Sequence, residues 1–250
     1  MTFSADHQVL RRPEERVLPV SPRPHSVVIM SKVFLDIGAH VGETLQVAMR
    51  ERWAFDRIVC FEPAPQCWAD LEALADERVE LCKFGLWTCD TTMALHDPGA
   101  IGASLFAAKS ISVESAMVDL RDAAHWFSAN ISATDEVIVK VNCEGAECDL
   151  LAHLLAAGEL SNIREMVVHF DVRKVDGSEG KEEPVRRALD EARVPYRAAE
   201  TIFFGRNTPE KTLNWLAWLH APRWKRPLYS VIRRIEFKAR VTIYNLRHGK

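Results

Sequence analysis

The sequence of 250 residues is first informative for what it lacks. It has no uninterrupted apolar run long enough to span a bilayer or to form the core of a signal peptide. The formal net charge is only -3, so composition gives no support for nucleic-acid binding. There is no internal repeat and no low-complexity tract. We therefore expect a cytoplasmic protein, either soluble or peripherally attached to the inner face of the membrane.

The cysteines also lack a motif. No two of them form a Cys-x-x-Cys pair, so neither a zinc site nor a thioredoxin-like centre is indicated. We expect free thiols in a reducing compartment, mostly buried. The six are Cys60, Cys67, Cys82, Cys89, Cys143 and Cys148.

Strand-like and helix-like segments alternate along most of the chain. Expected strands are 33–37, 57–62, 79–87, 136–144, 164–171, 196–204 and 213–219, with short strands at 92–97 and 113–120. Expected helices are 43–53, 65–76, 147–157 and 182–193, with a helical turn at 121–127. This alternation predicts an α/β, Rossmann-like fold: a mostly parallel seven-stranded sheet with helices on both faces. Since no helix separates its last two strands, one edge strand should be antiparallel.

Composition divides the chain into three parts. Residues 1–27 are rich in Pro, Arg, Glu and Ser, which is typical of a flexible leader. Residues 28–221 carry the alternating pattern and form the expected domain. Residues 222–250 form a basic extension.

The first candidate site is Asp36-Ile-Gly38-Ala39-His-Val-Gly42, a glycine-bearing turn after the first strand. Glycines let the backbone approach a ligand, and a helix start offers unpaired N–H groups. The spacing Asp-x-Gly-x-x-x-Gly is typical of S-adenosylmethionine (SAM) sites, whereas dinucleotide sites carry Gly-x-Gly-x-x-Gly. Asp36, Gly38 and Gly42 would then line the methionine end of SAM. The alternative is an ordinary strand–turn–helix.

The next strand ends in Glu62-Pro63. A carboxylate at this position can accept both hydroxyls of a ribose, and Pro63 would shape the loop beneath the adenine. The alternative for Glu62 is a surface carboxylate with no ligand.

The second candidate site follows a central strand, at Asn142, Glu144 and Glu147. Two carboxylates and an amide there could orient a hydroxyl substrate, bind a cation or hold the SAM amino group. Alternatively, the two glutamates only cap the following helix, where negative charge is favourable.

The third candidate site is His169 and Asp171, at the end of the next strand. His169 could be a general base if its pKa lies near the working pH. Asp171 could act likewise if desolvated. The alternative for His169 is a hydrogen-bonded core residue.

Together these segments resemble the FkbM family of SAM-dependent methyltransferases. The resemblance rests on Phe34-Leu-Asp-Ile-Gly-Ala-His-Val-Gly42, Val59-Cys-Phe-Glu-Pro-Ala-Pro65 and Val139-Lys-Val-Asn-Cys-Glu-Gly-Ala-Glu147, with the loop Gly102-Ala-Ser-Leu105 and the segment Met117-Val-Asp-Leu120. It covers residues 33–219 and implies a class I methyltransferase fold. It also implies SAM as cofactor, bound by Asp36, Gly38, Ala39, Gly42, Glu62, Pro63 and Asn142. The implied reaction is O-methylation, most often of a hydroxyl on a sugar or natural product.

Methyl transfer to an alcohol calls for a base or a cation near the acceptor oxygen. Glu144, His169 and Asp171 are the candidates for the base, in no fixed order. Many family members carry Asp at the position of Asn142, and some have His at that of Asp171, which leaves the base open. A divalent ion such as Mg²⁺ on Asn142, Glu144 and Asp171 is a further alternative.

The basic extension has three alternative roles. Trp224 and apolar residues at helical spacing accompany the basic side chains, which suits an anionic membrane surface. The extension could instead bind an anionic glycan precursor, or pack on the sheet or in a dimer interface. A nucleic-acid role is not expected, because nothing else in the chain supports one. Its basic residues are Arg223, Lys225, Arg226, Arg233, Arg234, Lys238, Arg240, Arg247 and Lys250, against one acid, Glu236.

The functional hypothesis is a SAM-dependent O-methyltransferase that transfers a methyl group to a hydroxyl of a sugar, in a polysaccharide, a glycolipid or a glycosylated natural product. The alternative is a catalytically silent subunit of the same fold that binds SAM, or a partner or membrane through its basic extension. A nicotinamide-dependent oxidoreductase is disfavoured, because Gly-x-Gly-x-x-Gly is missing at the first turn.

Overall fold

The computed structural model describes residues 30–107, 113–178, 180–202, 204–227, 231 and 235. The predicted leader 1–27 and most of the basic extension lie outside these residues, and both remain predictions. None of the described helices is both long and apolar enough to cross a membrane.

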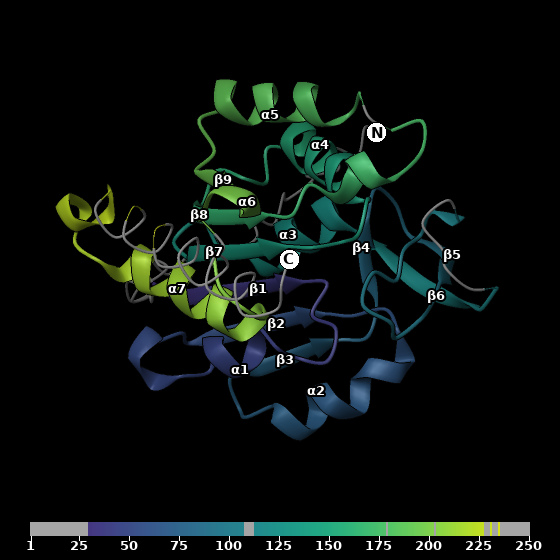
Figure 1. Ribbon diagram of the computed structural model, residues 1–250, viewed down its shortest axis with the longest axis horizontal. Helices are drawn as coiled ribbons and strands as arrows, with labels where there is room; N and C mark the ends of the chain where they lie inside the picture. Colours follow the sequence, from purple (N-terminus) through teal and green to yellow (C-terminus); the bar gives the residue numbers. More distant parts are fainter. Residues whose placement is uncertain are drawn as a thin grey trace, which may run out of the picture.

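A six-stranded sheet forms the centre of the described chain, and every pairing in it is parallel. The strand order is β3-β2-β1-β7-β8-β9, which Figure 1 shows from bottom to top. The strands are β1 (Lys32–Ile37), β2 (Arg57–Phe61), β3 (Val79–Cys82), β7 (Glu136–Val141), β8 (Ile163–Val168) and β9 (Tyr196–Ala198). The predicted α/β fold with a parallel sheet is confirmed.

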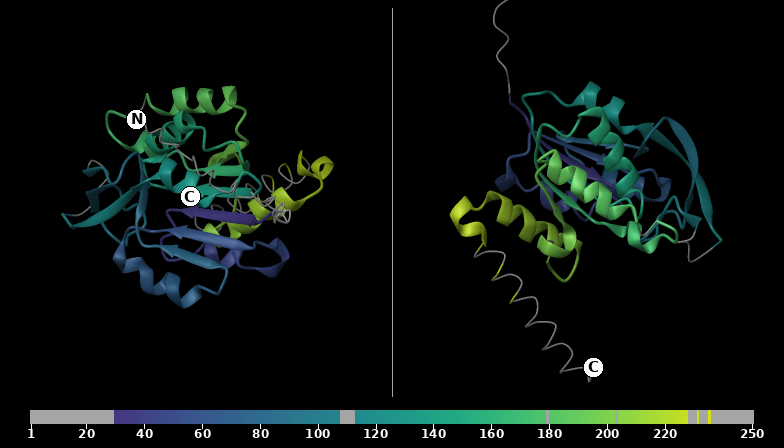
Figure 2. Two further views of the ribbon diagram at one scale, coloured as in Figure 1. Left: turned by 180° about the vertical axis from the view of Figure 1, so that it is seen from behind. Right: turned by 90° about the horizontal axis from the view of Figure 1, so that it is seen from above.

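Helices cover both faces of this sheet (Figures 1 and 2). On β1, Val33, Leu35 and Ile37 pack with α3 (Ala123–Asn130), α4 (Glu147–Ala157) and α5 (Glu182–Glu191). Phe34, on the opposite side of the same strand, packs with α1 (Leu45–Ala48), α2 (Trp68–Leu74) and α7 (Thr208–His220). Because side chains alternate along a strand, one apolar run fills both layers, as expected for a central parallel strand.

A second, three-stranded sheet lies beside the first, at the right of Figure 1. It contains β4 (Gly85–Trp87), β5 (Thr91–His96) and β6 (Ser115–Asp122) in the order β4-β6-β5. The predicted strand 79–87 is therefore two strands in different sheets. On β6 the buried Val118 and Leu120 alternate with exposed residues, as expected for a sheet with one solvated face.

The predicted antiparallel edge strand at 213–219 is wrong, and the main sheet has six strands rather than seven among the described residues. This segment belongs to the helix α7. Asn207 caps it by accepting a hydrogen bond from the Glu210 N–H at 3.0 Å, and Pro209 lies in its first turn. The buried residues of α7 recur at a helical period. This period is hard to recognise in the sequence, because tryptophan and leucine also stand between the buried positions. The buried residues include Thr212, Trp215, Leu216 and Leu219.

The other predicted helices and strands differ less from the observed elements. The helix expected at 147–157 is confirmed as α4, which ends at Gly158 in a left-handed conformation. The helix expected at 43–53 is instead the short α1 followed by the 3₁₀ turn η1 (Glu51–Trp53). Strand 196–204 is shortened to β9, and α6 (Ala199–Ile202) follows. The remaining turns are η2 (Pro65–Cys67), η4 (Asp171–Lys174) and η5 (Arg223–Lys225).

Candidate functional site

A cavity lies at the carboxyl ends of β1, β2, β7 and β8. Its walls come from residues 37–40, 61–64 and 142–144, from His169, and from a loop at 99–105. The first turn of α7 contributes Thr208 and Lys211. Ligands of open α/β sheets bind at this edge, so the strand ends predicted to carry the site do meet in one cavity.

The turn after β1 lies directly against the end of β7. Gly38 has a φ of +82°, and a Cβ built on it would be 2.1 Å from the carbonyl oxygen of Asn142. The N–H groups of Gly38 and Ala39 both donate to the carbonyl of Phe61 at 3.1 Å. Only glycine fits this approach, so Gly38 holds the ends of three neighbouring strands together while it lines the cavity.

Gly42 has a different place. Its φ is +84°, and an added Cβ would meet the side chain of Leu74 at 2.6 Å and that of Leu71 at 3.1 Å. These leucines belong to α2, and Gly42 is not among the described residues that line the cavity. Its observed role is therefore the close packing of the turn on α2.

Glu62 lines the cavity with its carboxylate held in place. One oxygen, Oε2, accepts the N–H of His40 at 2.7 Å, and Oε1 accepts the N–H of Ala64 at 2.9 Å. The residue is only 7% exposed, and this burial raises the pKa of the carboxyl group above its ordinary value. Each oxygen keeps further acceptor capacity, so the fixed carboxylate can accept two hydroxyl groups from a ligand.

Asp36 is fully buried, and it is not among the described residues of the cavity wall. Its Oδ1 accepts a hydrogen bond from Lys140 Nζ at 2.8 Å, and the same ammonium donates to the carbonyl of Gly38 at 2.9 Å. Burial raises the pKa of Asp36, an effect that the Lys140 charge partly offsets. Asp36 thus acts on the cavity through Lys140, which lines the wall.

Asn142 presents an unsatisfied acceptor. Its side chain lines the cavity, and its Oδ1 is buried without a hydrogen-bond partner within the described part of the chain. A buried amide oxygen without a partner is costly, and a ligand N–H or O–H would relieve that cost. Together with the Glu62 acceptor and the close backbone at Gly38, this fits a ligand that brings ribose hydroxyls and an ammonium group, as SAM does.

Glu144 lies in the same wall, half-buried, in a left-handed backbone conformation with φ 51°. The hydroxyl of Ser104 donates to its carbonyl oxygen at 2.7 Å. This hydrogen bond connects the loop at 99–105 to the end of β7. It therefore fixes the position of the loop relative to Glu144.

Glu147, in contrast, is the first residue of α4, and its carboxylate binds the turn that precedes the helix. It is fully buried, its two carboxylate oxygens accept the N–H of Gly145 at 3.0 Å, and Oε1 also accepts that of Cys143 at 3.1 Å. Burial raises the pKa of Glu147 to about 7. Both of these partners precede α4, so Glu147 fixes the turn that leads from β7 into the helix, and its predicted capping of the helix itself stays a prediction.

His169 lines the cavity at the end of β8. Burial, reinforced by the charge of Lys140, lowers its pKa to about 4. The imidazole is therefore neutral at physiological pH, and it does not meet the condition set for a general base with a pKa near the working pH.

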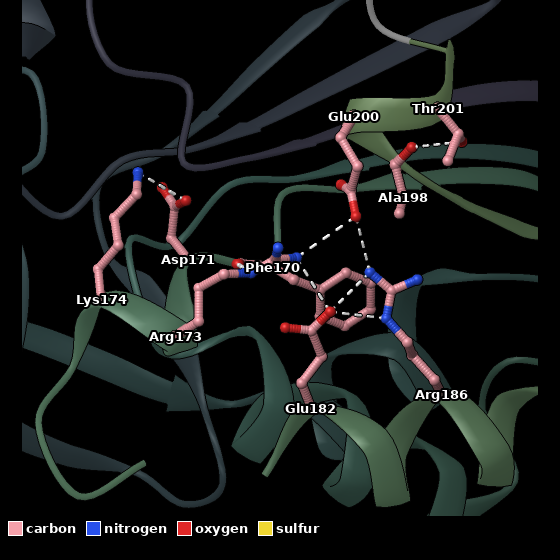
Figure 3. A network of polar contacts seen from close by, with 9 residues as sticks. All are labelled: Phe170, Asp171, Arg173, Lys174, Glu182, Arg186, Ala198, Glu200 and Thr201. Carbon is pink, nitrogen blue, oxygen red and sulfur yellow. Dashed lines mark hydrogen bonds and ion pairs between the residues drawn. The ribbon is translucent and has the colours of Figure 1, made fainter. Parts of the chain in front are cut away.

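Asp171 lies outside the cavity wall, as far as the described residues show. It forms an ion pair with Lys174 within η4 at 2.7 Å. Figure 3 shows this pair beside a second network, in which Arg173 and Arg186 bind Glu182 and Glu200.

The predicted metal alternative finds no support in this arrangement. No group of three or more His, Cys, Asp or Glu side chains in the described ranges is placed to hold a metal ion. Of the predicted ligands, Asn142 and Glu144 line the cavity while Asp171 pairs with Lys174. A metal ion on these three residues stays a prediction.

Comparisons with known proteins find one similar solved structure and no similar sequence. No family model matches the sequence, and no curated protein matches it. Among solved structures, the chain is similar to a crystal structure of methyltransferase FkbM from Methylobacillus flagellatus KT, with 14% sequence identity and a TM-score of 0.42. The match covers 66% of this chain and 38% of the FkbM chain, which is well under two thirds of the length of that protein. Function therefore has to be argued from the cavity itself.

Sequence reasoning missed several residues of the wall. His40 has a φ of 51° and its Nε2 lies 3.1 Å from the carbonyl oxygen of Gly99. Lys140 was read only as part of an apolar strand, although a lysine inside such a run signals a buried charge that needs a partner. Thr208 and Lys211 were missed because the strand predicted at 213–219 leaves them in a loop before it, whereas they form the first turn of α7.

Proposed function

We propose that this protein is a SAM-dependent methyltransferase that methylates a hydroxyl group. The observation that carries the proposal is the Glu62 carboxylate, which two backbone N–H groups orient in a cavity shared with Asn142 Oδ1. Glu62 would accept the ribose hydroxyls, and Pro63 and Leu86 of the same wall would contact the adenine. Asn142 would accept a hydrogen bond from the cofactor's ammonium group, beside the close backbone of Gly38.

SAM supplies a methyl group on a sulfonium, and the protein supplies alignment and exclusion of water. Among the residues predicted as the base, Glu144 is favoured. Asp171 pairs with Lys174 and is not among the described residues of the cavity wall, and a His169 with a pKa of about 4 is a weak proton acceptor. Glu144 would accept the proton of the acceptor hydroxyl as its oxygen bonds to the methyl carbon, while the carbon–sulfur bond would break and S-adenosylhomocysteine would leave.

A sugar hydroxyl, in a polysaccharide, glycolipid or glycosylated natural product, is the acceptor that we propose. The sugar acceptor is supported only by the sequence resemblance to the FkbM family, because no contact in the cavity identifies a sugar. The competing proposal, a silent subunit that binds SAM without turnover, retains Glu62 and Asn142 but needs no base.

A screen for transfer of labelled methyl from SAM to a panel of mono- and oligosaccharides tests the proposal. With an acceptor in hand, we expect Glu144→Gln to lower kcat by about 10²–10⁴-fold. Affinity for S-adenosylhomocysteine should change little in the same variant. The matched control is Asp171→Asn, which should leave kcat within a few-fold of the wild type.

The outcomes separate the two proposals. Tight binding of S-adenosylhomocysteine without transfer to any acceptor would favour the silent subunit. Equal loss of kcat in Glu144→Gln and Asp171→Asn would overturn the assignment of Glu144 as the base.

A further inference from the structure

An exposed aromatic side chain follows the end of α7. Trp224, in η5, is 76% exposed, and Val231 and Ile235 are 54% and 61% exposed. Val231 and Ile235 both have a helical backbone and are four residues apart in sequence, the spacing of neighbours on a helix face. Large apolar side chains gathered in one short segment mark an interaction surface more often than scattered ones do.

The exposure of Trp224 is built into the fold. Arg226 donates to the carbonyl of Leu219 at 2.6 Å and to that of Ala221 at 3.1 Å, while Trp218 Nε1 donates to the carbonyl of Arg226 at 3.2 Å. These bonds fasten the segment to the carboxyl end of α7. Trp218 is buried at this junction, and Trp224 is left facing solvent.

Positive charge surrounds the exposed tryptophan. Arg223 and Lys225 are exposed on either side of it, and Lys225 Nζ lies 4.9 Å from the centroid of the Trp224 ring. From residue 223 onward the sequence holds nine basic residues and one acidic residue, in a chain with a formal net charge of -3. In sequence, the segment that begins at Arg223 is therefore strongly basic, and its described cations Arg223 and Lys225 flank the exposed Trp224.

We propose that this segment, centred on Trp224 with Val231 and Ile235, docks the protein on the anionic surface of a phospholipid bilayer. Tryptophan is favoured at the membrane interface, and each neighbouring Lys or Arg adds attraction to anionic lipid. A second copy of the chain is the less suitable partner, because a symmetric contact would bring the same cations face to face.

The docking surface and the cavity lie at opposite ends of one helix. The first turn of α7 lines the cavity through Thr208 and Lys211, and its last turn carries η5. An α-helix rises 1.5 Å per residue, so the 13 residues of α7 separate the two by about 20 Å. Trp224 is therefore not part of the cavity, and the inference does not depend on the proposed reaction.

Vesicle flotation of the full chain tests the docking. We expect flotation with vesicles of phosphatidylcholine and phosphatidylglycerol, none with phosphatidylcholine alone, and loss of binding at high salt. Trp224→Ala should lower the partition coefficient roughly tenfold. Lys225→Gln should lower it about fivefold. The matched control is Met117→Ala, since Met117 on β6 is 66% exposed and lies outside the basic segment.

Two results would overturn the proposal. One is an absence of wild-type flotation, or flotation that is equal on anionic and neutral vesicles. The other is concentration-dependent self-association, measured by light scattering, that Trp224→Ala abolishes while flotation stays unchanged. That second result would assign the surface to another copy of the chain.

Discussion

At the scale of single residues, the site depends on a contact between two backbones. Gly38 and the carbonyl of Asn142 approach so closely that no side chain fits between them. The same turn positions His40, whose N–H orients the Glu62 carboxylate. One glycine therefore holds together the parts of the cavity that come from β1, β2 and β7.

Gly38→Ala should destabilise the protein by more than about 3 kcal/mol, because a strained φ adds to a clash with backbone. Thermal or urea unfolding measures the loss. The matched control is Gly158→Ala, where φ is +78° but a new Cβ would meet nothing within 4 Å. That variant should lose only about 1–2 kcal/mol. Equal losses in the two variants would show that the approach of Gly38 to Asn142 is not tight in solution.

At the scale of elements, α4 begins with a buried acid whose charge is disfavoured by the fold. Glu147 caps the turn after β7, and its pKa is raised from 4.5 to about 7. A carboxyl whose pKa is raised on folding contributes stability below its unfolded pKa and loses that contribution as pH rises through the folded pKa. The free energy of unfolding should therefore fall between pH 4.5 and about pH 7.

Glu147→Gln should remove this part of the pH dependence, because glutamine keeps an acceptor oxygen but does not ionise in this range. The expected contribution of Glu147 to the fall in the wild type is about 3 kcal/mol over the window, and the buried Glu165, whose pKa is also raised to about 7, adds to it. Denaturant unfolding at several pH values between 4.5 and 7.5 measures it, with the exposed Glu72→Gln of α2 as control. A slope in Glu147→Gln equal to that of the wild type would rule out Glu147 as its source.

The elements also show where sequence reasoning succeeds. The segments that became β1, β2, β7 and α4 carry strong local signals: a continuous apolar run, or a helical pattern closed by Gly158. In α7 the local sequence led to a wrong prediction of a strand at 213–219, because tryptophan and leucine in close succession also suit a strand. What decides this element is the Asn207 cap and the burial of Trp215 against Phe34, a contact between distant parts of the chain.

At the scale of the whole molecule, the parallel topology brings the predicted motifs together. Glu62, Asn142, Glu144 and His169 follow three different strands and line one cavity, which could be predicted because parallel strands end at the same edge. Side-chain direction could not be predicted. Asp36 turns to Lys140, and Asp171 pairs with Lys174, because each acid meets a cation that comes from the assembled fold or the next turn.

Binding of S-adenosylhomocysteine, measured by titration calorimetry, tests the central claim most directly. The wild type should bind it, and Glu62→Ala should weaken binding by roughly 10–100-fold, since each hydrogen bond to a charged acceptor contributes about 1.5–3 kcal/mol. Glu72→Ala, on the exposed face of α2, should bind like the wild type. No binding by the wild type, or equal binding by the wild type and Glu62→Ala, would contradict a SAM site in this cavity.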